Sequence, residues 1–522
     1  MTTRPTVRAA NGIVASGHHL ATSAGLAALR EGGNAVDAAV TAAAVCGVVM
    51  PHRTSFGGDV FALVYDARSR EVSAYNGSGA APRSIDRELF RAGFPTQGGA
   101  LATVPGAIAA LVDLANEHGR LGLDRDLAPA IAYAEGGFPV SDVLAEGMAE
   151  EGERLALDPE ATRIFGPRGR WPQAGEMLQQ PDLAASLRAI ARDGADVFYR
   201  GDLGARFVEG IAAIGGAIDR GDLSAHRTDH PEAIAIEYRG LRVIGQPPVS
   251  QGHILLEELA IAEGLDLRAM EWGSADLVHQ MVETKKLAFA DRDAFAGDPR
   301  HVEFDPRRLL AGEFVASRRR ALAGKATERT EAGSLMTPAD TTYLAVVDRD
   351  GNAVSLIESV FSAFGAAVIV PGTGLLLNNR LTGFALDARS PNALVGGKRP
   401  VHTLNTVIVL DGSAPRFVFG TPGRHAQVQT NFQLAVALID FGMDVQRAIE
   451  EPRWFHESGR TLKVERRYPE AVRRALATKG HEIAVLDDWA AVTGGAQAIA
   501  IEPNGAFAGG ADPRREGQAA GY

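Results

Sequence analysis

A pair of threonines at the start of a strand-like segment is the part of this sequence best suited to chemistry. The segment begins Asp340-Thr341-Thr342-Tyr343 and follows a polar stretch with little apolar periodicity. Threonine is common in strands, so strand propensity alone accounts for the pair. A second interpretation is that the chain cuts itself before Thr341, which places a new α-amine beside the hydroxyl nucleophile. An α-amine titrates near about pH 8, so it can accept the hydroxyl proton at neutral pH.

Other patterns that could carry chemistry are weaker. The sequence has no GxxxxGK[ST] phosphate loop and no G-x-S-x-G nucleophile turn. His226 and His230 have a spacing that would suit a metal on a helix, but the zincin glutamate is missing and the stretch is polar. His18 and His19 precede a predicted helix, where capping or exposure is the expected role. We therefore predict no metal and no cofactor.

Positioning a nucleophile requires a rigid scaffold, and the pattern of the chain changes near residue 340. Before that point it is mainly helical, with helices predicted over 20–30, 35–50, 107–118 and 275–291 and a strand over 61–65. The stretch 313–340 carries three consecutive arginines and scattered Gly and Ser, which predicts an exposed, mobile segment.

After residue 340 strands dominate. A hairpin is predicted from 343–347 and 353–360 across an Asp-Arg-Asp-Gly-Asn turn. Further strands are predicted over 368–370, 374–377, 406–410 and 417–420, helices over 427–441 and 445–451, and a last hairpin over 496–501 and 506–509. Helices flanking a mostly antiparallel sheet indicate a layered α+β fold.

Composition excludes several classes of protein. The 522 residues are 46% apolar and 22% charged, as in ordinary globular chains. The net charge of −11 removes the electrostatic basis for binding nucleic acid. One cysteine, Cys46, allows no intrachain disulfide and no cysteine-based metal cage. The longest apolar run, 38–50, is shorter than the roughly 20 residues of a membrane span, and no signal-peptide core follows Met1. We therefore expect a cytoplasmic protein with no membrane partner.

Many ordered sequence blocks resemble the gamma-glutamyltranspeptidase family of N-terminal nucleophile hydrolases, over nearly the whole chain. Besides the threonine pair, the blocks are 32–39 (GGNAVDAA), 51–58 (PHRTSFGG), 104–106 (VPG), 288–292 (AFADR), 297–299 (GDP), 350–354 (DGNAV), 376–379 (LLNN), 398–400 (KRP), 420–423 (GTPG), 512–514 (DPR) and 521–522 (GY).

The resemblance implies a four-layer αββα sandwich made as one precursor. Cleavage between Asp340 and Thr341 would give a large subunit, 1–340, and a small subunit, 341–522, which together form one domain. The resemblance implies a heterodimer of these two pieces or a dimer of such heterodimers. Thr341 takes the place of the family nucleophile. Ser359 stands where the family has a threonine that supports the nucleophile's hydroxyl. No cofactor is implied.

The loop Gly420-Thr421-Pro422-Gly423 resembles the family's oxyanion-hole loop, whose donors are backbone N–H groups of Gly423 and the next residue. The family usually has a second glycine there, and this chain has Arg424. A backbone donor survives this change if the required φ does.

The positions that bind substrate in the family depart from its glutamyl pattern. Phe361 replaces an asparagine, Arg380 and the residue after it replace a glutamine and an acid, and His402 and Thr403 replace a serine pair. The acid would bind a substrate α-ammonium, and an unpaired buried ammonium costs several kcal/mol. We therefore expect Arg380, assisted by His402, to bind a compact anion with no acid beside them. An alternative is that Arg380 pairs with an acid from another loop, such as Asp387.

Three functions remain open. The first is a self-processing amidohydrolase that acts through an acyl-enzyme on a small carboxylate-bearing amide, as in the oxamate amidohydrolase branch. The second is a γ-glutamyl hydrolase or transferase acting on glutathione and related amides. The third is a non-catalytic protein that keeps the fold, against which the intact Thr341, Ser359 and Gly-Thr-Pro-Gly loop argue.

Overall fold

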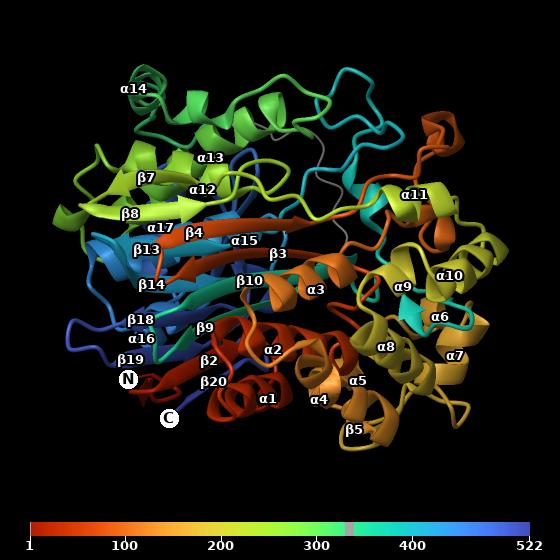
Figure 1. Ribbon diagram of the computed structural model, residues 1–522. Helices are drawn as coiled ribbons and strands as arrows, with labels where there is room; N and C mark the ends of the chain where they lie inside the picture. Colours follow the sequence, from red (N-terminus) through yellow and green to blue (C-terminus); the bar gives the residue numbers. More distant parts are fainter. Residues whose placement is uncertain (1, 329–338) are drawn as a thin grey trace.

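Two antiparallel sheets face each other at the centre of the molecule, as a computed structural model that describes residues 2–328 and 339–522 shows (Figure 1). The six-stranded sheet has the order β20 (Gln518–Gly521), β2 (Gly12–Ser16), β9 (Ala339–Asp348), β10 (Ala353–Ser362), β3 (Asp59–Asp66), β4 (Glu71–Gly77). The seven-stranded sheet has the order β1 (Val7–Ala9), β19 (Phe507–Ala511), β18 (Gln497–Ile501), β14 (Ala414–Gly420), β13 (Val407–Asp411), β8 (Leu241–Gly245), β7 (Ile234–Tyr238).

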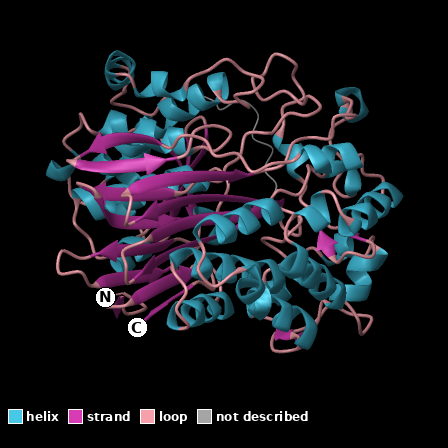
Figure 2. Ribbon diagram, in the orientation of Figure 1, coloured by secondary structure: helices cyan, strands magenta, loops and turns pink. Residues whose placement is uncertain are grey.

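The inner faces of the two sheets share one apolar core. Phe61 and Tyr343 from the six-stranded sheet pack with Ile408, Val418 and Ile499 from the seven-stranded sheet, and all five are buried. Alternation along each strand sends the remaining apolar side chains outward, where they need a second cover. Helices supply that cover on both sides (Figure 2).

One helical layer covers the six-stranded sheet and is built from α1 (His19–Arg30), α2 (Ala35–Val49), α3 (Ala107–His118) and α4 (Leu123–Gly136). Every residue of α2 is buried, because this alanine-rich helix lies between the sheet and its neighbouring helices. The other layer covers the seven-stranded sheet and is built from α12 (Gly252–Ala262), α13 (Ala275–Phe295), α15 (Ala426–Ala435) and α16 (Val445–Glu450). The four-layer αββα sandwich predicted from the sequence is therefore confirmed.

Smaller elements complete the fold. A helical lobe beside the sandwich contains α5 (Asp142–Glu150), α6 (Gly152–Leu155), α7 (Pro159–Phe165), α8 (Pro181–Asp193), α9 (Asp196–Tyr199), α10 (Asp202–Ala213) and α11 (Arg220–Ala225) (Figure 1). A three-stranded sheet of β15 (Trp454–Ser458), β16 (Thr461–Glu465) and β17 (Glu482–Leu486) adjoins α17 (Glu470–Thr478). Short strand pairs are β5 (Phe138–Pro139) with β6 (Met177–Leu178) and β11 (Ile369–Val370) with β12 (Leu375–Leu376).

Two expectations for the stretch 313–340 need correction. Its first part is not mobile, because α14 (Gly312–Arg320) is a regular helix with Val315 buried against α12 and α13. Its last two residues are already strand, since β9 begins at Ala339 rather than after Thr341. Residues 329–338 lie outside the described part of the chain.

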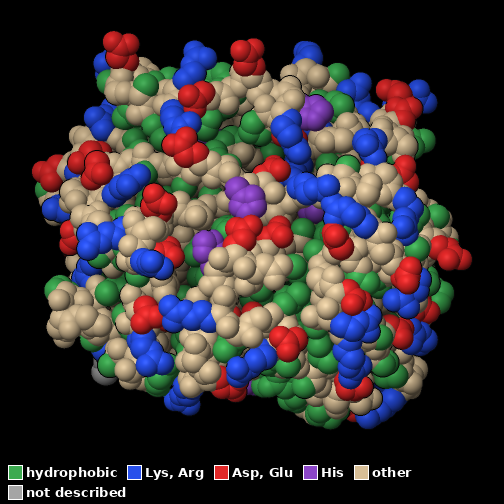
Figure 3. Space-filling view, in the orientation of Figure 1, with side chains coloured by type: hydrophobic (Ala, Val, Ile, Leu, Met, Phe, Trp, Pro, Cys, Tyr) green, Lys and Arg blue, Asp and Glu red, His purple; other side chains and the backbone are tan. Residues whose placement is uncertain are grey.

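The surface mixes charges of both signs on the face shown in Figure 3, in keeping with a modest net charge of −11. No helix within the described residues is both long enough and apolar enough to cross a membrane.

Candidate active site

Thr341 lies near the start of β9, where its side chain is 2% exposed. Its hydroxyl donates a hydrogen bond to the hydroxyl oxygen of Ser359 on the neighbouring strand β10, at 3.1 Å. Ser359 itself is fully buried. The two residues that the sequence assigned to nucleophile and support are thus in direct contact, 18 positions apart in the chain.

A β-bulge on β10 places Ser359 opposite the threonine. The pairing of β9 with β10 is regular up to Thr342 with Glu358 and resumes at Asp340 with Phe361, so an extra residue is accommodated between them. Phe361 adopts a φ of 83°, in the left-handed region that aromatic residues avoid. In this conformation its backbone N–H donates to the Ser359 hydroxyl at 2.8 Å. The peptide bond before Thr341 therefore lies in paired strand, facing the bulge, and not in an exposed loop.

Two guanidinium groups, from different parts of the chain, lie against the ring of Phe361. The Cζ atom of Arg380 lies 4.5 Å from the ring centroid and that of Arg424 lies 4.6 Å from it. Contacts of this kind are favourable because the face of an aromatic ring attracts a cation. Phe361 thus joins the bulge, the Arg380 position and the loop before α15 into one site.

Arg380 is fully buried and pairs with an acid that the sequence did not indicate. Its Nε donates to Oδ2 of Asp59 at 3.0 Å, and the other oxygen of Asp59 accepts the N–H of Gly79 at 3.0 Å. The expectation that no acid lies beside Arg380 is therefore wrong. Asp387, the acid named as an alternative partner, pairs instead with Arg389.

Two nitrogens of the Arg380 guanidinium, Nη1 and Nη2, take no part in this ion pair. Neither Nη1 nor Nη2 has a hydrogen-bond partner among the described residues, although both are shielded from solvent. Because a buried guanidinium without partners is costly, these two donors mark a place for an acceptor. Burial also raises the pKa of the Asp59 carboxyl, and the nearby Arg380 opposes that rise.

His402 shares this environment. Its ring packs against Phe61 at 5.0 Å between centroids, and neither ring nitrogen has a hydrogen-bond partner in the described part of the chain. Burial, followed by the charges of Arg380 and Arg399, lowers its pKa well below the usual value, so the ring is neutral. His402 can thus offer one N–H donor but no positive charge. Thr403 beside it is buried, and its carbonyl accepts from Asn405 at 3.2 Å.

The Gly-Thr-Pro-Gly loop connects β14 to α15 and has an unusual backbone. Gly423 has a φ of 128° and Arg424 a φ of 52°, so the residue that replaces the family's second glycine keeps a left-handed conformation despite its side chain. Their carbonyls accept from Ala426 and Gln427, each at 2.9 Å, and so belong to the first turn of α15. Successive N–H groups at such a turn, before a helix N-terminus, form a concavity suited to an anion.

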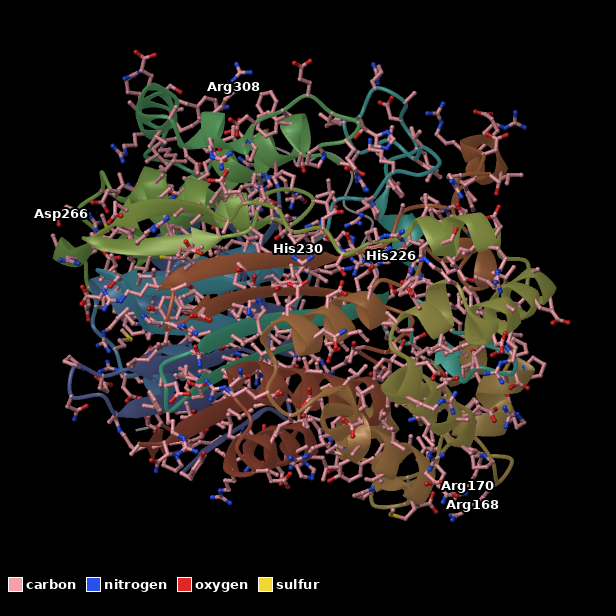
Figure 4. The ribbon with its side chains drawn as sticks, in the orientation of Figure 1. Arg168, Arg170, His226, His230, Asp266 and Arg308 are labelled. Atoms are coloured by element: carbon pink, nitrogen blue, oxygen red, sulfur yellow. The ribbon has the colours of Figure 1, made fainter. Side chains whose placement is uncertain are left out.

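The histidines singled out in the sequence contact other protein groups. His226 and His230 contact different residues: the ring of His226 stacks on Tyr199, and the ring of His230 packs against Tyr75 in an edge-on arrangement (Figure 4). His18 caps α1, its Nδ1 accepting from the N–H of Leu20 at 3.2 Å.

A buried His279, Glu283 and His481 cluster has metal-like spacing. It is already joined by hydrogen bonds: His279 contacts His481 at 2.9 Å, and Glu283 accepts from Lys286 at 2.8 Å. Burial, followed by the charge of Lys286, lowers the pKa of His481 to about 3, and the same Lys286 charge opposes a bound cation. We therefore assign this cluster a role in stabilising the fold and not in binding a metal.

Sequence reasoning named Thr341, Ser359 and the loop as candidates but missed Asp59, the partner of Arg380. That residue follows the Gly57-Gly58 block quoted for the family, which was the available signal. Its pairing with Arg380 spans 321 positions and requires the fold.

Comparisons with known proteins identify the family of the chain. A family model described as gamma-glutamyltranspeptidase matches residues 21–522. The chain is 38% identical over 524 residues to the glutathione hydrolase-like YwrD proenzyme of Bacillus subtilis (strain 168), with 98% of each chain covered. It is 37% identical over 527 residues to the oxamate amidohydrolase proenzyme of Klebsiella pneumoniae, again with 98% of each chain covered.

A solved structure, the cephalosporin acylase from Bacillus halodurans, matches with a TM-score of 0.94 and 37% identity, covering 100% of this chain and 98% of that chain. The alignments span the helical layers, both sheets and the strand that carries Thr341. The chain therefore belongs to the gamma-glutamyltranspeptidase family and is a self-processing amide hydrolase of the N-terminal nucleophile type.

Proposed function

We propose that the chain cuts itself between Asp340 and Thr341 and then hydrolyses the amide bond of a small carboxylate-bearing substrate of the oxamate class. The two products would be residues 1–340 and 341–522, held together as a heterodimer. The observation that carries the substrate class is the buried edge of Arg380, whose Nη1 and Nη2 are unpaired among the described residues. A carboxylate matches such a planar two-donor edge.

The position of Thr341 supports self-cleavage. Its hydroxyl oxygen would attack the carbonyl carbon of Asp340, the C–N bond would break, and the nitrogen would leave as the α-amine of Thr341. Water would then hydrolyse the resulting ester. The contact with Ser359 at 3.1 Å orients the hydroxyl for this step.

Substrate turnover would reuse the same oxygen. The free α-amine of Thr341 would accept the hydroxyl proton as the oxygen attacks the amide carbonyl. The N–H groups of Gly423 and Arg424 would stabilise the negative charge on the carbonyl oxygen. The amine product would leave with a proton, and water would release the acid from the acyl-enzyme. Arg380 and the neutral His402 would hold the substrate's carboxylate, with Phe361 and Thr403 as neighbouring walls.

The γ-glutamyl alternative gains support from one observation. Asp59 lies beside Arg380, so the pair together is neutral and includes an acid. A γ-glutamyl head group carries both a carboxylate and an ammonium, which a paired Arg and Asp could bind. Asp59 already accepts from Arg380 and Gly79, however, which leaves it less able to bind an ammonium.

The deciding experiment measures two activities of the same preparation. Ammonia release would be assayed on oxamate and on homologous small acidic amides, and chromogen release on γ-glutamyl-p-nitroanilide. A higher kcat/KM on the acidic amides, lost in Thr341→Ala, is expected. A preference for the γ-glutamyl compound would place the second function ahead of the first.

A further inference from the structure

A buried arginine on α13 contacts the residue that precedes α15. Arg292 is 6% exposed, and its Nη1 lies 3.0 Å from Nδ1 of His425. Arginine can only donate, so Nδ1 must accept and the ring proton must lie on Nε2. This contact joins two segments that are 133 positions apart.

The arginine is itself held in place. Its guanidinium lies over the ring of Phe289, at 4.2 Å from the centroid, and forms an ion pair with Asp293 at 2.8 Å. Phe289 and Asp293 belong to the same helix as Arg292, so α13 presents the guanidinium as a rigid group.

Cations surround His425 from several elements. Burial lowers its pKa well below the usual value, and the charges of Arg292 and Arg424 lower it further. Lys285 contributes less, because burial lowers the pKa of its own ammonium well below the usual value. Glu258 of α12 faces the same region, but burial raises its pKa well above the usual value, so it adds little negative charge. The ring is therefore neutral, and Arg292 is the group that fixes which nitrogen carries the proton.

The backbone of His425 is fixed as well. Its carbonyl accepts from Nε2 of Gln429 at 3.0 Å, and Gln429 also bonds to the N–H and carbonyl of His456 on β15. Since the carbonyls of Gly423 and Arg424 are used by the first turn of α15, the side chain of His425 adds the anchor that ties the turn to α13.

We infer that Arg292 is a positioning residue, which holds His425 as the Nε2–H tautomer and thereby holds the N–H groups of Gly423 and Arg424 in place. This inference rests on the proposed function, because it assigns those N–H groups to the oxyanion. Arg292 touches neither substrate nor nucleophile in this scheme. Its effect is on the transition state and not on substrate binding.

The test compares Arg292→Met, Arg292→Gln and Arg292→Lys with wild type on oxamate and γ-glutamyl-p-nitroanilide. For Met and Gln we expect kcat to fall about tenfold or more with KM within about twofold, since a small displacement of an oxyanion donor has effects of that order. Arg239→Met is the matched control, because Arg239 is a largely buried arginine that pairs with an acid, Asp440, as Arg292 pairs with Asp293. Melting temperatures identify variants that fail to fold, and Gln and Lys retain a donor if Met does not fold.

A second readout is rescue by the conservative variant. Arg292→Lys keeps a positively charged donor for Nδ1 of His425 and should recover most of the kcat that Arg292→Met loses. Unchanged kcat in folded Arg292→Met and Arg292→Gln, or a loss of kcat that Arg292→Lys does not recover at all, would overturn the inference and assign Arg292 to packing. Failure of the proposed function looks different, since wild type itself would then show no cleavage at Thr341 or no turnover.

Discussion

Asp59 and Arg380 form an ion pair with no solvent exposure on either side chain, and the Nε to Oδ2 distance is 3.0 Å. The pair joins the first residue of β3 to the short helical turn after Asn378 and Asn379. Only one of the three guanidinium nitrogens is used by the acid, so the pair fixes the direction of the other two.

The ion pair predicts different effects for its two members. Arg380→Lys should raise KM for a small acidic amide about tenfold or more, because lysine cannot reproduce the two-donor edge. Asp59→Asn should lower stability by about 3–5 kcal/mol, because it leaves a buried charge without its partner. Steady-state kinetics and chemical denaturation measure the two effects. If Arg380→Lys and Arg380→Ala both keep wild-type KM, the carboxylate pocket must be abandoned.

Self-cleavage gives the most direct prediction. Purified protein should separate on a denaturing gel into two pieces, residues 1–340 and residues 341–522, the second of which has 182 residues. Thr341→Ala should remain a single chain, and N-terminal sequencing of the smaller wild-type piece should begin at Thr341. Turnover by a chain that never cleaves would exclude the α-amine mechanism.

The Ser359 hydroxyl should matter for cleavage and turnover alike. Ser359→Ala removes the acceptor of the Thr341 hydroxyl and of the Phe361 N–H. Leaving such buried donors unsatisfied costs about 1–3 kcal/mol, or roughly a five- to 150-fold loss in rate if all of it appears in the transition state. Ser359→Thr keeps the hydroxyl and should be mild. Time courses of cleavage in freshly translated protein provide the measurement, and equal rates in the Ala variant would reduce Ser359 to strand packing.

Backbone conformation at Arg424 can be separated from its side chain. Arg424→Gly and Arg424→Ala both remove the contact with Phe361, but only glycine adopts a φ of 52° without strain. The Gly variant should therefore be more stable than the Ala variant by about 1 kcal/mol. If the donor is the backbone N–H, kcat should fall less in Gly than in Ala. Thermal unfolding and kcat of the two variants, measured side by side, test this.

Asp126 predicts how stability depends on pH. It is buried near the start of α4 with no partner among the described residues for either oxygen, and burial, then the neighbouring Asp37 and Asp124, raise its pKa from 3.8 to about 8. Between these values the folded state holds a proton that the unfolded state has released, so stability falls as the pH rises through that window. Asp126→Asn should flatten this slope between pH 5 and 8, whereas Asp202→Asn, exposed in the first turn of α10, should not. Denaturation midpoints at several pH values decide the matter.

Much of the fold could be predicted because local pattern and tertiary structure agree. The predicted helix 107–118 has the bounds of α3, and the hairpin after residue 340 appears as β9 and β10. The predicted helix 427–441 holds as α15 and then continues as a π-helical turn, Val436–Asp440. In these places apolar periodicity and turn residues carry enough information.

Other features depend on partners far away in the chain. The early start of β9 comes from its pairing with the far side of the β10 bulge, and no local residue signals it. The three arginines 318–320 suggested a mobile segment, but only Arg320 is exposed, and the buried Val315 anchors the helix they end. Asp59 and His425 became relevant only when the fold placed them beside Arg380 and Arg292.

The order of the strands has a consequence for the molecularity of folding. In the six-stranded sheet β2, β3 and β4 precede residue 340, whereas β10, β20 and all of β9 from Thr341 onward follow it. The two groups are interleaved, because β2 lies between β20 and β9 and β3 pairs with β10. The precursor folds as one molecule, so its refolding rate does not depend on concentration. Once cut, the same fold belongs to two molecules, and regaining it after denaturation becomes a second-order encounter between chains that each lack several strands of both sheets. Cleavage would thus make the mature enzyme's stability largely kinetic: it persists because both sheets must open together before either chain can leave.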